Sequence, residues 1–172
     1  MAYEVSRRNF LKGAAAMTVA AAASTLLAGC DGSSNPPAPN EIVLGDYKVK
    51  VTTAKTTQET VAGKEDKLTG YITPVVSISY SGKGSPTFLY NEIFTSGTIG
   101  ESKMTLTNPL QPYNSIVGTF VSCEPKYRTT DKAAYTDYTN SKKPMTLKVS
   151  FDDKNYAVFE IWNNGTITQS KI

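Results

Sequence analysis

Histidine is missing from this sequence of 172 residues. Histidine is the commonest general base, the commonest zinc ligand and the usual partner of a nucleophilic serine or cysteine. Chemistry based on carboxylates, lysine or tyrosine remains open, so its absence disfavours an enzyme without excluding one. We therefore expect no enzyme, no catalytic residue, no metal and no cofactor, and we keep a hydrolase that works without histidine as the weakest alternative.

Cysteine is almost as scarce, since only Cys30 and Cys123 occur. If Cys30 carries a lipid, no disulfide can form within the mature chain. Cys123 would then be a lone thiol in an oxidising compartment, where burial protects it best. It falls in phase with Val117 and Val121, which predicts a buried, apolar role. A reactive thiol would need a partner that lowers its pKa, such as histidine.

Net charge is also small. The 18 Lys and Arg residues outnumber the 15 Asp and Glu residues by three. Three of the basic residues and one acidic residue precede Cys30, and removing them leaves 15 basic and 14 acidic residues. A nearly neutral domain exerts no long-range attraction on nucleic acid or on an anionic membrane surface. We therefore expect no nucleic-acid partner.

Two motifs near the amino terminus resemble export signals. The first resembles the twin-arginine export motif, with its arginine pair followed by an aromatic residue, leucine and lysine: Ser6, Arg7, Arg8, Phe10, Leu11 and Lys12. An alanine-rich apolar stretch follows over residues 13–27, shorter than the ~20 strongly apolar residues of a membrane span. The second motif, Leu27-Ala28-Gly29-Cys30, resembles the lipobox of bacterial lipoproteins.

These resemblances imply a location and a set of partners. Cleavage before Cys30 would leave a lipid-bearing amino terminus, with a diacylglycerol on the thiol and a further acyl chain such as palmitate. The chain would meet the twin-arginine translocase and the lipoprotein-processing enzymes during export. It would then lie on the extracytoplasmic face of the cell membrane, anchored by its lipid. Substrates of this route usually cross the membrane already folded.

The pattern changes again after Cys30. Residues 31–40 are small, polar and proline-rich, which predicts an extended tether of roughly 30 Å. We assign residues 1–29 to a helical signal peptide, residues 30–41 to the lipidated cysteine and flexible tether, and residues 42–172 to one folded domain.

Alternation with period two dominates that domain. Apolar and polar residues alternate over 47–52, 76–80, 145–151 and 157–161, and weaker strand candidates lie at 88–94, 104–107 and 115–123. Polar turns are expected at 152–155 and 163–165. No helical repeat stands out after residue 30. We therefore expect an all-β domain, an antiparallel sandwich of about seven to eight strands.

The domain resembles the small immunoglobulin-like, or telokin-like, sandwiches of uncharacterised cell-surface lipoproteins. The likeness is carried by residues 47–53, 75–80 and 147–161. The Cys-Trp-Cys framework of antibody domains is missing, because only Cys123 and Trp162 are available. The resemblance implies no catalytic residues to carry over.

The long irregular stretch 124–144 holds the best candidate site. Tyr127, Tyr135 and Tyr138 could form a stacking platform for sugar or peptide. Alternatively, the stretch folds back and its tyrosines cover the edge of the sandwich. On the first reading the protein is a binding or accessory module for an unknown small ligand or envelope protein. The alternative is a structural or assembly component of an envelope complex that uses an exposed edge strand.

Three other clusters have simpler readings. Asp152, Asp153 and Asn155 could coordinate a hard cation, but such residues also satisfy a hairpin turn. The mixed-charge segment containing Glu59, Glu65 and Asp66 could supply a carboxylate pair for glycoside hydrolysis, or be a solvated loop. Glycines over residues 82–100 lack the spacing of a phosphate-binding loop.

Overall fold

The computed structural model describes residues 38–61 and 64–171. The twin-arginine motif, the lipobox with Cys30 and most of the expected tether lie outside the described residues. No helix of the described part is long and apolar enough to cross a membrane.

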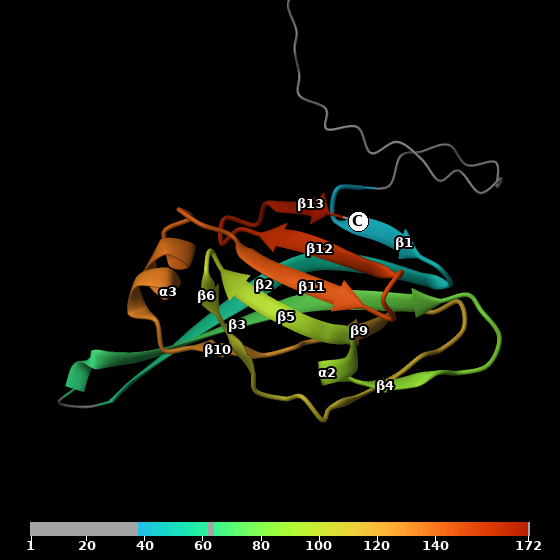
Figure 1. Ribbon diagram of the computed structural model, residues 1–172, viewed down its shortest axis with the longest axis horizontal. Helices are drawn as coiled ribbons and strands as arrows, with labels where there is room; N and C mark the ends of the chain where they lie inside the picture. Colours follow the sequence, from blue (N-terminus) through green and yellow to red (C-terminus); the bar gives the residue numbers. More distant parts are fainter. Residues whose placement is uncertain (1–37, 62–63, 172) are drawn as a thin grey trace, which may run out of the picture. The chain divides into compact units, whose positions relative to one another are not determined.

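Two antiparallel sheets and one short two-stranded ribbon make up the domain (Figure 1). The first, which we call the hairpin sheet, has the order β1-β2-β3-β10-β7, and β9 also pairs with β3. Its strands are β1 (Glu41–Leu44), β2 (Tyr47–Val61), β3 (Lys64–Tyr80), β7 (Thr105–Leu106), β9 (Val121–Cys123) and β10 (Tyr127–Thr129). The second, the C-terminal sheet, has the order β13-β12-β11-β5-β6. Its strands are β5 (Phe94–Ile99), β6 (Ser102–Lys103), β11 (Met145–Ser150), β12 (Tyr156–Ile161) and β13 (Ile167–Lys171). The ribbon joins β4 (Thr87–Leu89) to β8 (Pro112–Asn114).

The inward faces of the two sheets share one apolar core. In β11, Met145, Leu147 and Val149 are fully buried, and they alternate with partly exposed polar residues. Ile72 and Val76 of β3 belong to the same core cluster. Because the side-chain period of a strand is two, this alternation buries one face of each sheet. The expectation of an all-β antiparallel fold is confirmed.

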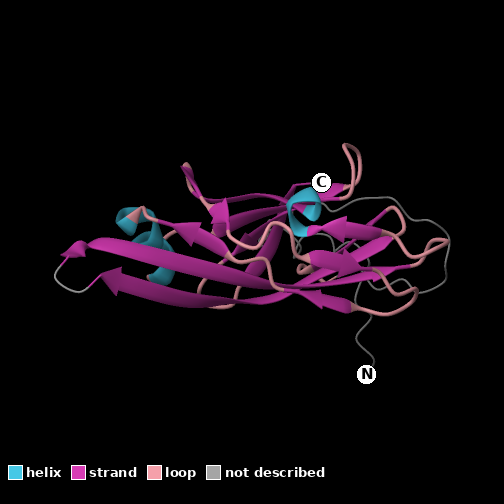
Figure 2. Ribbon diagram, turned by 90° about the horizontal axis from the view of Figure 1, so that it is seen from below, coloured by secondary structure: helices cyan, strands magenta, loops and turns pink. Residues whose placement is uncertain are grey.

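β2 runs far beyond its neighbour β1 and carries a β-bulge close to where their pairing ends. The pairing of β2 with β3 shifts between Val51 and Thr53, so the inward-facing set changes from Val49 and Val51 to Ala54 and the residues in phase with it. β2 and β3 have 15 and 17 residues, against six in β11 and β12. Figures 1 and 2 show the far part of this hairpin extending beyond the other strands.

Several local predictions were wrong. Thirteen strands occur in the described part rather than seven or eight, because some have only two or three residues. The expected strand 88–94 is interrupted by the helical turn α2 (Tyr90–Ile93), and the candidate 115–123 shortens to β9. The segment expected to be a mixed-charge loop after Glu59 is instead the continuation of the β2–β3 hairpin.

One helix lies where no helical repeat stands out in the sequence, since α3 spans Lys132–Thr139. Asp131 caps it: its carboxylate accepts a hydrogen bond from the backbone N–H of Ala134 at 3.0 Å. The helix has only eight residues and a mostly polar composition, so it leaves no helical repeat that sequence inspection can detect.

Candidate functional site

The three candidate tyrosines are buried in the core rather than displayed on a surface. Tyr127, Tyr135 and Tyr138 are 1%, 4% and 0% exposed. The hydroxyl of Tyr127 donates to the carbonyl of Phe94 at 3.1 Å, and that of Tyr135 donates to the carbonyl of Thr57 at 3.1 Å. The structure therefore supports the alternative in which this stretch folds back onto the sandwich. These rings do not form an exposed platform.

Two glycines make room for these rings. A Cβ atom on Gly97 would lie 2.7 Å from the ring of Tyr127, and one on Gly70 would meet the ring of Tyr135. Real Cβ atoms do not approach so closely, so both positions need a residue without a side chain. The tyrosines are thus specific packing elements that hold the segment after Cys123 onto both sheets.

Cys123 is buried at 1% exposure, as its phase predicted. Val117 is 53% exposed, because it forms an isolated bridge with Tyr80 before β9 begins and does not share the strand face of Cys123. Burial raises the pKa of the Cys123 thiol to about 11, and a hydrogen bond with Tyr90 only partly opposes this effect. A thiol with such a raised pKa carries almost no thiolate at neutral pH and is unsuited to redox or nucleophilic chemistry.

The Asp152 carboxylate is used within its own turn. It accepts hydrogen bonds from the backbone N–H groups of Lys154 and Asn155 at 2.8 and 2.7 Å, and from the Asn155 side chain at 2.7 Å. These bonds lower the pKa of Asp152. The described residues contain no group of three or more acids and cysteines placed to hold a metal ion. The three hydrogen bonds of Asp152 show that this cluster forms the polar turn between β11 and β12.

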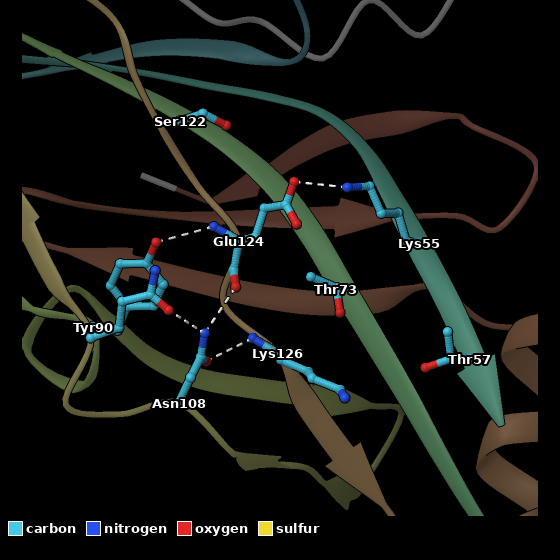
Figure 3. Close-up of a pocket in the computed structure, with 9 residues that line it drawn as sticks. Lys55, Thr57, Thr73, Tyr90, Asn108, Ser122, Glu124 and Lys126 are labelled. Atoms are coloured by element: carbon cyan, nitrogen blue, oxygen red, sulfur yellow. Dashed lines mark hydrogen bonds and ion pairs between the residues drawn. The ribbon is translucent and has the colours of Figure 1, made fainter. Parts of the chain in front are cut away.

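A polar groove lies instead on the outer face of the hairpin sheet (Figure 3). It has a volume of about 580 Å³, within the range of ligand sites in proteins. Its floor comes from β2 and β3, and its wall comes from residues of the 90–126 part of the chain. The lining residues are Lys55, Thr57, Thr73, Tyr90, Asn108, Gln111, Ser122, Glu124 and Lys126.

Asn108 holds the wall of this groove together. Its amide nitrogen donates to the side chain of Gln111 at 3.0 Å and to the carbonyl of Glu124 at 3.1 Å. Its amide oxygen accepts from the backbone N–H of Lys126 at 2.9 Å. The hydroxyl of Tyr90 accepts from the backbone N–H of Glu124 at 3.2 Å. The wall is thus fixed by side chain to backbone hydrogen bonds, although little regular secondary structure occurs there.

Charged groups of both signs face the groove. The ammonium of Lys55 lies 2.7 Å from the carboxylate of Glu124, as Figure 3 shows. Their side chains are 60% and 49% exposed, so this pair contributes little stability and stays accessible to a ligand. The ammonium of Lys126 lies 4.1 Å from the ring centre of Tyr71, whose hydroxyl donates to Glu59 at 3.1 Å. Burial raises the pKa of Tyr90 to about 12.

Sequence reasoning missed this groove. Thr73 lies on the polar face that the alternation of residues 76–80 predicts for β3. Lys55 and Thr57 reach the same face only because the bulge between Val51 and Thr53 shifts the phase of β2, and the sequence pattern does not predict that shift. Asn108, Gln111 and Glu124 belong to turn-rich segments without a motif, and no signal in the sequence places them beside β2 and β3.

Comparison with known proteins recognises the amino-terminal segment. Residues 4–24 match the TAT (twin-arginine translocation) pathway signal sequence. No curated protein and no solved structure matches the chain. The match confirms the export motif that includes Arg7 and Arg8, and it implies interaction with the twin-arginine translocase during export. The chain therefore carries a signal for export across the cytoplasmic membrane.

Proposed function

We propose that the mature protein is a lipid-anchored, extracytoplasmic binding module that recognises its ligand without covalent chemistry. The observation that carries this proposal is the groove on the outer face of the hairpin sheet. Nine mostly polar side chains line it, and its floor is a paired sheet. Sites built on strands hold their side chains more firmly than sites on loops.

The chemistry of the lining favours a ligand rich in hydroxyl groups, such as an oligosaccharide. Hydroxyl, amide, ammonium and carboxylate groups all occur there, so the groove offers both donors and acceptors. A sugar hydroxyl both donates and accepts, which suits such a mixture better than a simple ion does. Two lysines against one glutamate leave the lining with a small positive excess, which tolerates an acidic sugar.

The anchor is the other half of the proposal. The signal sequence supports export, and Leu27-Ala28-Gly29-Cys30 directly after it resembles a lipobox. Lipidation at Cys30 would keep the domain close to the bilayer. The likeness to immunoglobulin-like lipoprotein domains also belongs to this proposal, and the antiparallel sheets of the structure are consistent with it.

Cys30→Ala tests the anchor. We expect the wild-type protein to stay with the membranes after a carbonate wash, with an intact mass that corresponds to residues 30–172 plus lipid. The variant should lose the lipid mass and leave the membrane fraction. A variant that stays in the washed membranes would contradict lipid anchoring and point to an uncleaved signal segment.

Titration with defined oligosaccharides tests the groove. Thr73→Val and Ser122→Ala remove one hydroxyl each from the lining with little change in volume. We expect each to weaken binding by about fivefold to tenfold, the loss of one hydrogen bond. Thr146→Val on β11 of the other sheet is the matched control and should bind as the wild type does. Equal losses of binding affinity in all three variants would contradict the proposal, and so would the absence of binding to every oligosaccharide tested.

A further inference from the structure

The far half of β2 has an edge that no described strand covers. β1 pairs with β2 only from Tyr47 to Lys50, and the bond from the N–H of Val51 to the carbonyl of Asn40 ends that contact. From residue 53 to residue 61, β2 pairs only with β3 in the part of the chain that the structure describes. Unpaired N–H and C=O groups along a strand edge are a template for another strand.

We infer that this edge pairs with the same edge of a second copy of the chain, antiparallel and centred on Thr57. The two hairpin sheets would then form one continuous sheet about a two-fold axis. In an antiparallel pair, two residues that lie opposite one another point to the same face of the sheet. The two-fold axis must therefore pass through one residue of the strand, since an axis between two residues would oppose residues of different faces. Thr57 is the midpoint of the uncovered segment 53–61, so this register pairs the whole edge.

The charges on the edge select the same register. With Thr57 at the centre, Lys55 of each copy lies opposite Glu59 of the other copy. Centring on residue 55 or 59 would oppose two lysines or two glutamates. Centring on residue 56 or 58 would leave both charges opposite threonine or valine. Opposite charges across a strand pair are stabilising and like charges are destabilising, so the segment is self-complementary in one register only.

The existing contacts of the two charged residues are compatible with this pairing. Lys55 is already 2.7 Å from Glu124, but its side chain is 60% exposed and its ammonium has three N–H donors. Glu59 accepts one hydrogen bond from Tyr71, and a carboxylate can accept several. β1 does not obstruct the pairing, because Val51 of one copy would lie beyond the end of the other copy's β2 at Val61.

The pairing has a consequence for the groove, although it does not depend on the groove binding a ligand. Lys55 and Thr57 line the groove, and both lie on the proposed interface. The two grooves of a dimer would therefore lie on the same face, one on each side of the axis. A chain-like ligand could contact both.

Cross-linking of the full-length chain in its native membranes tests the register. With Thr57→Cys, the two introduced cysteines would face one another at a Cα separation of about 4.5–5.5 Å, which suits a disulfide. We expect mild oxidation to give a disulfide-linked dimer, and reduction should convert it back to the monomer. Thr53→Cys is the matched control, because residue 53 lies opposite residue 61 and should not cross-link. Absence of the Thr57→Cys dimer would overturn the proposal, and so would a Thr53→Cys variant or an unmodified chain that cross-links as strongly as Thr57→Cys.

Charge reversal in the Thr57→Cys background provides a second test. Lys55→Glu or Glu59→Lys alone would oppose like charges twice per dimer and should weaken association by about tenfold. The double reversal restores opposite pairs and should recover the cross-linked dimer, while a thermal unfolding scan checks that each variant folds. Single variants that cross-link as the parent does, or a double variant that recovers nothing, would contradict the charge register.

Discussion

The two sheets of this domain are built from the same alternating strands but differ in how far their strands match one another. In the C-terminal sheet, β11 and β12 have six residues each and pair along their whole length. In the hairpin sheet, β2 and β3 run well past β1, β7, β9 and β10, and they leave an uncovered edge and an outer groove. Both sheets supply side chains to the shared core, and we propose that the hairpin sheet in addition provides surfaces for binding, whereas the C-terminal sheet mainly stabilises the fold.

The sharpest test of this difference is a core truncation in β11. Leu147→Ala removes a fully buried side chain from the C-terminal sheet and should lower the free energy of unfolding by about 2–5 kcal/mol. Thr57→Ala, on the exposed part of β2, should change it by less than ~0.5 kcal/mol. Urea unfolding of both variants measures the contrast. Similar losses in the two variants would contradict the division of roles.

Gly97 tests whether the C-terminal sheet is packed as tightly as the structure indicates. Gly97→Ala in β5 places a methyl group 2.7 Å from the Tyr127 ring, so the ring must move and strain its hydrogen bond to Phe94. We expect a loss of about 1–3 kcal/mol in the same urea experiment. Ser96→Ala, at an exposed neighbouring position, is the control and should have almost no effect. An unchanged Gly97→Ala variant would show that the ring has room.

The cap of α3 tests how firmly the helix supports the hairpin sheet, and it adds a pH dependence. Asp131→Ala should lower the free energy of unfolding by about 1 kcal/mol. The hydrogen bond from the Ala134 N–H, followed by one from Ser102, lowers the pKa of Asp131. The carboxylate's contribution is therefore present above its unfolded pKa and is lost as the pH falls through its folded pKa.

We accordingly expect the difference between the wild type and Asp131→Ala to shrink on acidification. Asp131→Asn, which can cap the helix but cannot ionise, should show a smaller change with pH. Chemical unfolding at a series of pH values measures both differences. A difference between the wild type and Asp131→Ala that is constant down to pH ~2 would contradict the role of the ionised carboxylate.

The smallest expected effect on stability belongs to the groove. Lys55→Met removes an exposed ion pair with Glu124 and should change the free energy of unfolding by about 0–1 kcal/mol. If the groove binds a polar ligand, the same variant should bind it more weakly while folding normally. Thermal unfolding together with ligand titration separates the two effects. A large loss of stability would show that Lys55 supports the fold rather than serving mainly as part of the binding surface.

Sequence reasoning predicted the parts of this molecule that depend on local pattern. The core strands β11 and β12 alternate cleanly, and their connecting turn is closed by Asp152 as expected. The export signal is a contiguous motif, so a single sequence is sufficient to detect it. The antiparallel all-β class follows from the same alternation.

The remaining features depend on contacts between distant segments. The groove exists because Asn108 bonds to the backbone of Glu124 and Lys126, and no local pattern encodes that approach. Tyr127 and Tyr135 are buried where glycines on two other strands leave room for their rings. The length of β2 was underestimated because exposed threonines, Gln58 and Glu59 carry no apolar alternation once both faces of a strand meet solvent.

The position of β11 has a consequence for the timing of folding. β11 lies between β12 and β5, and β5 ends at Ile99 whereas β11 begins at Met145. The C-terminal sheet therefore cannot close until residues 145–171, which hold β11, β12 and β13, have been synthesised. Pairing between segments that are distant in the sequence slows folding, because the long connection between them must be closed first. Substrates of the twin-arginine route usually cross the membrane already folded, so we expect this sheet to assemble before transport begins.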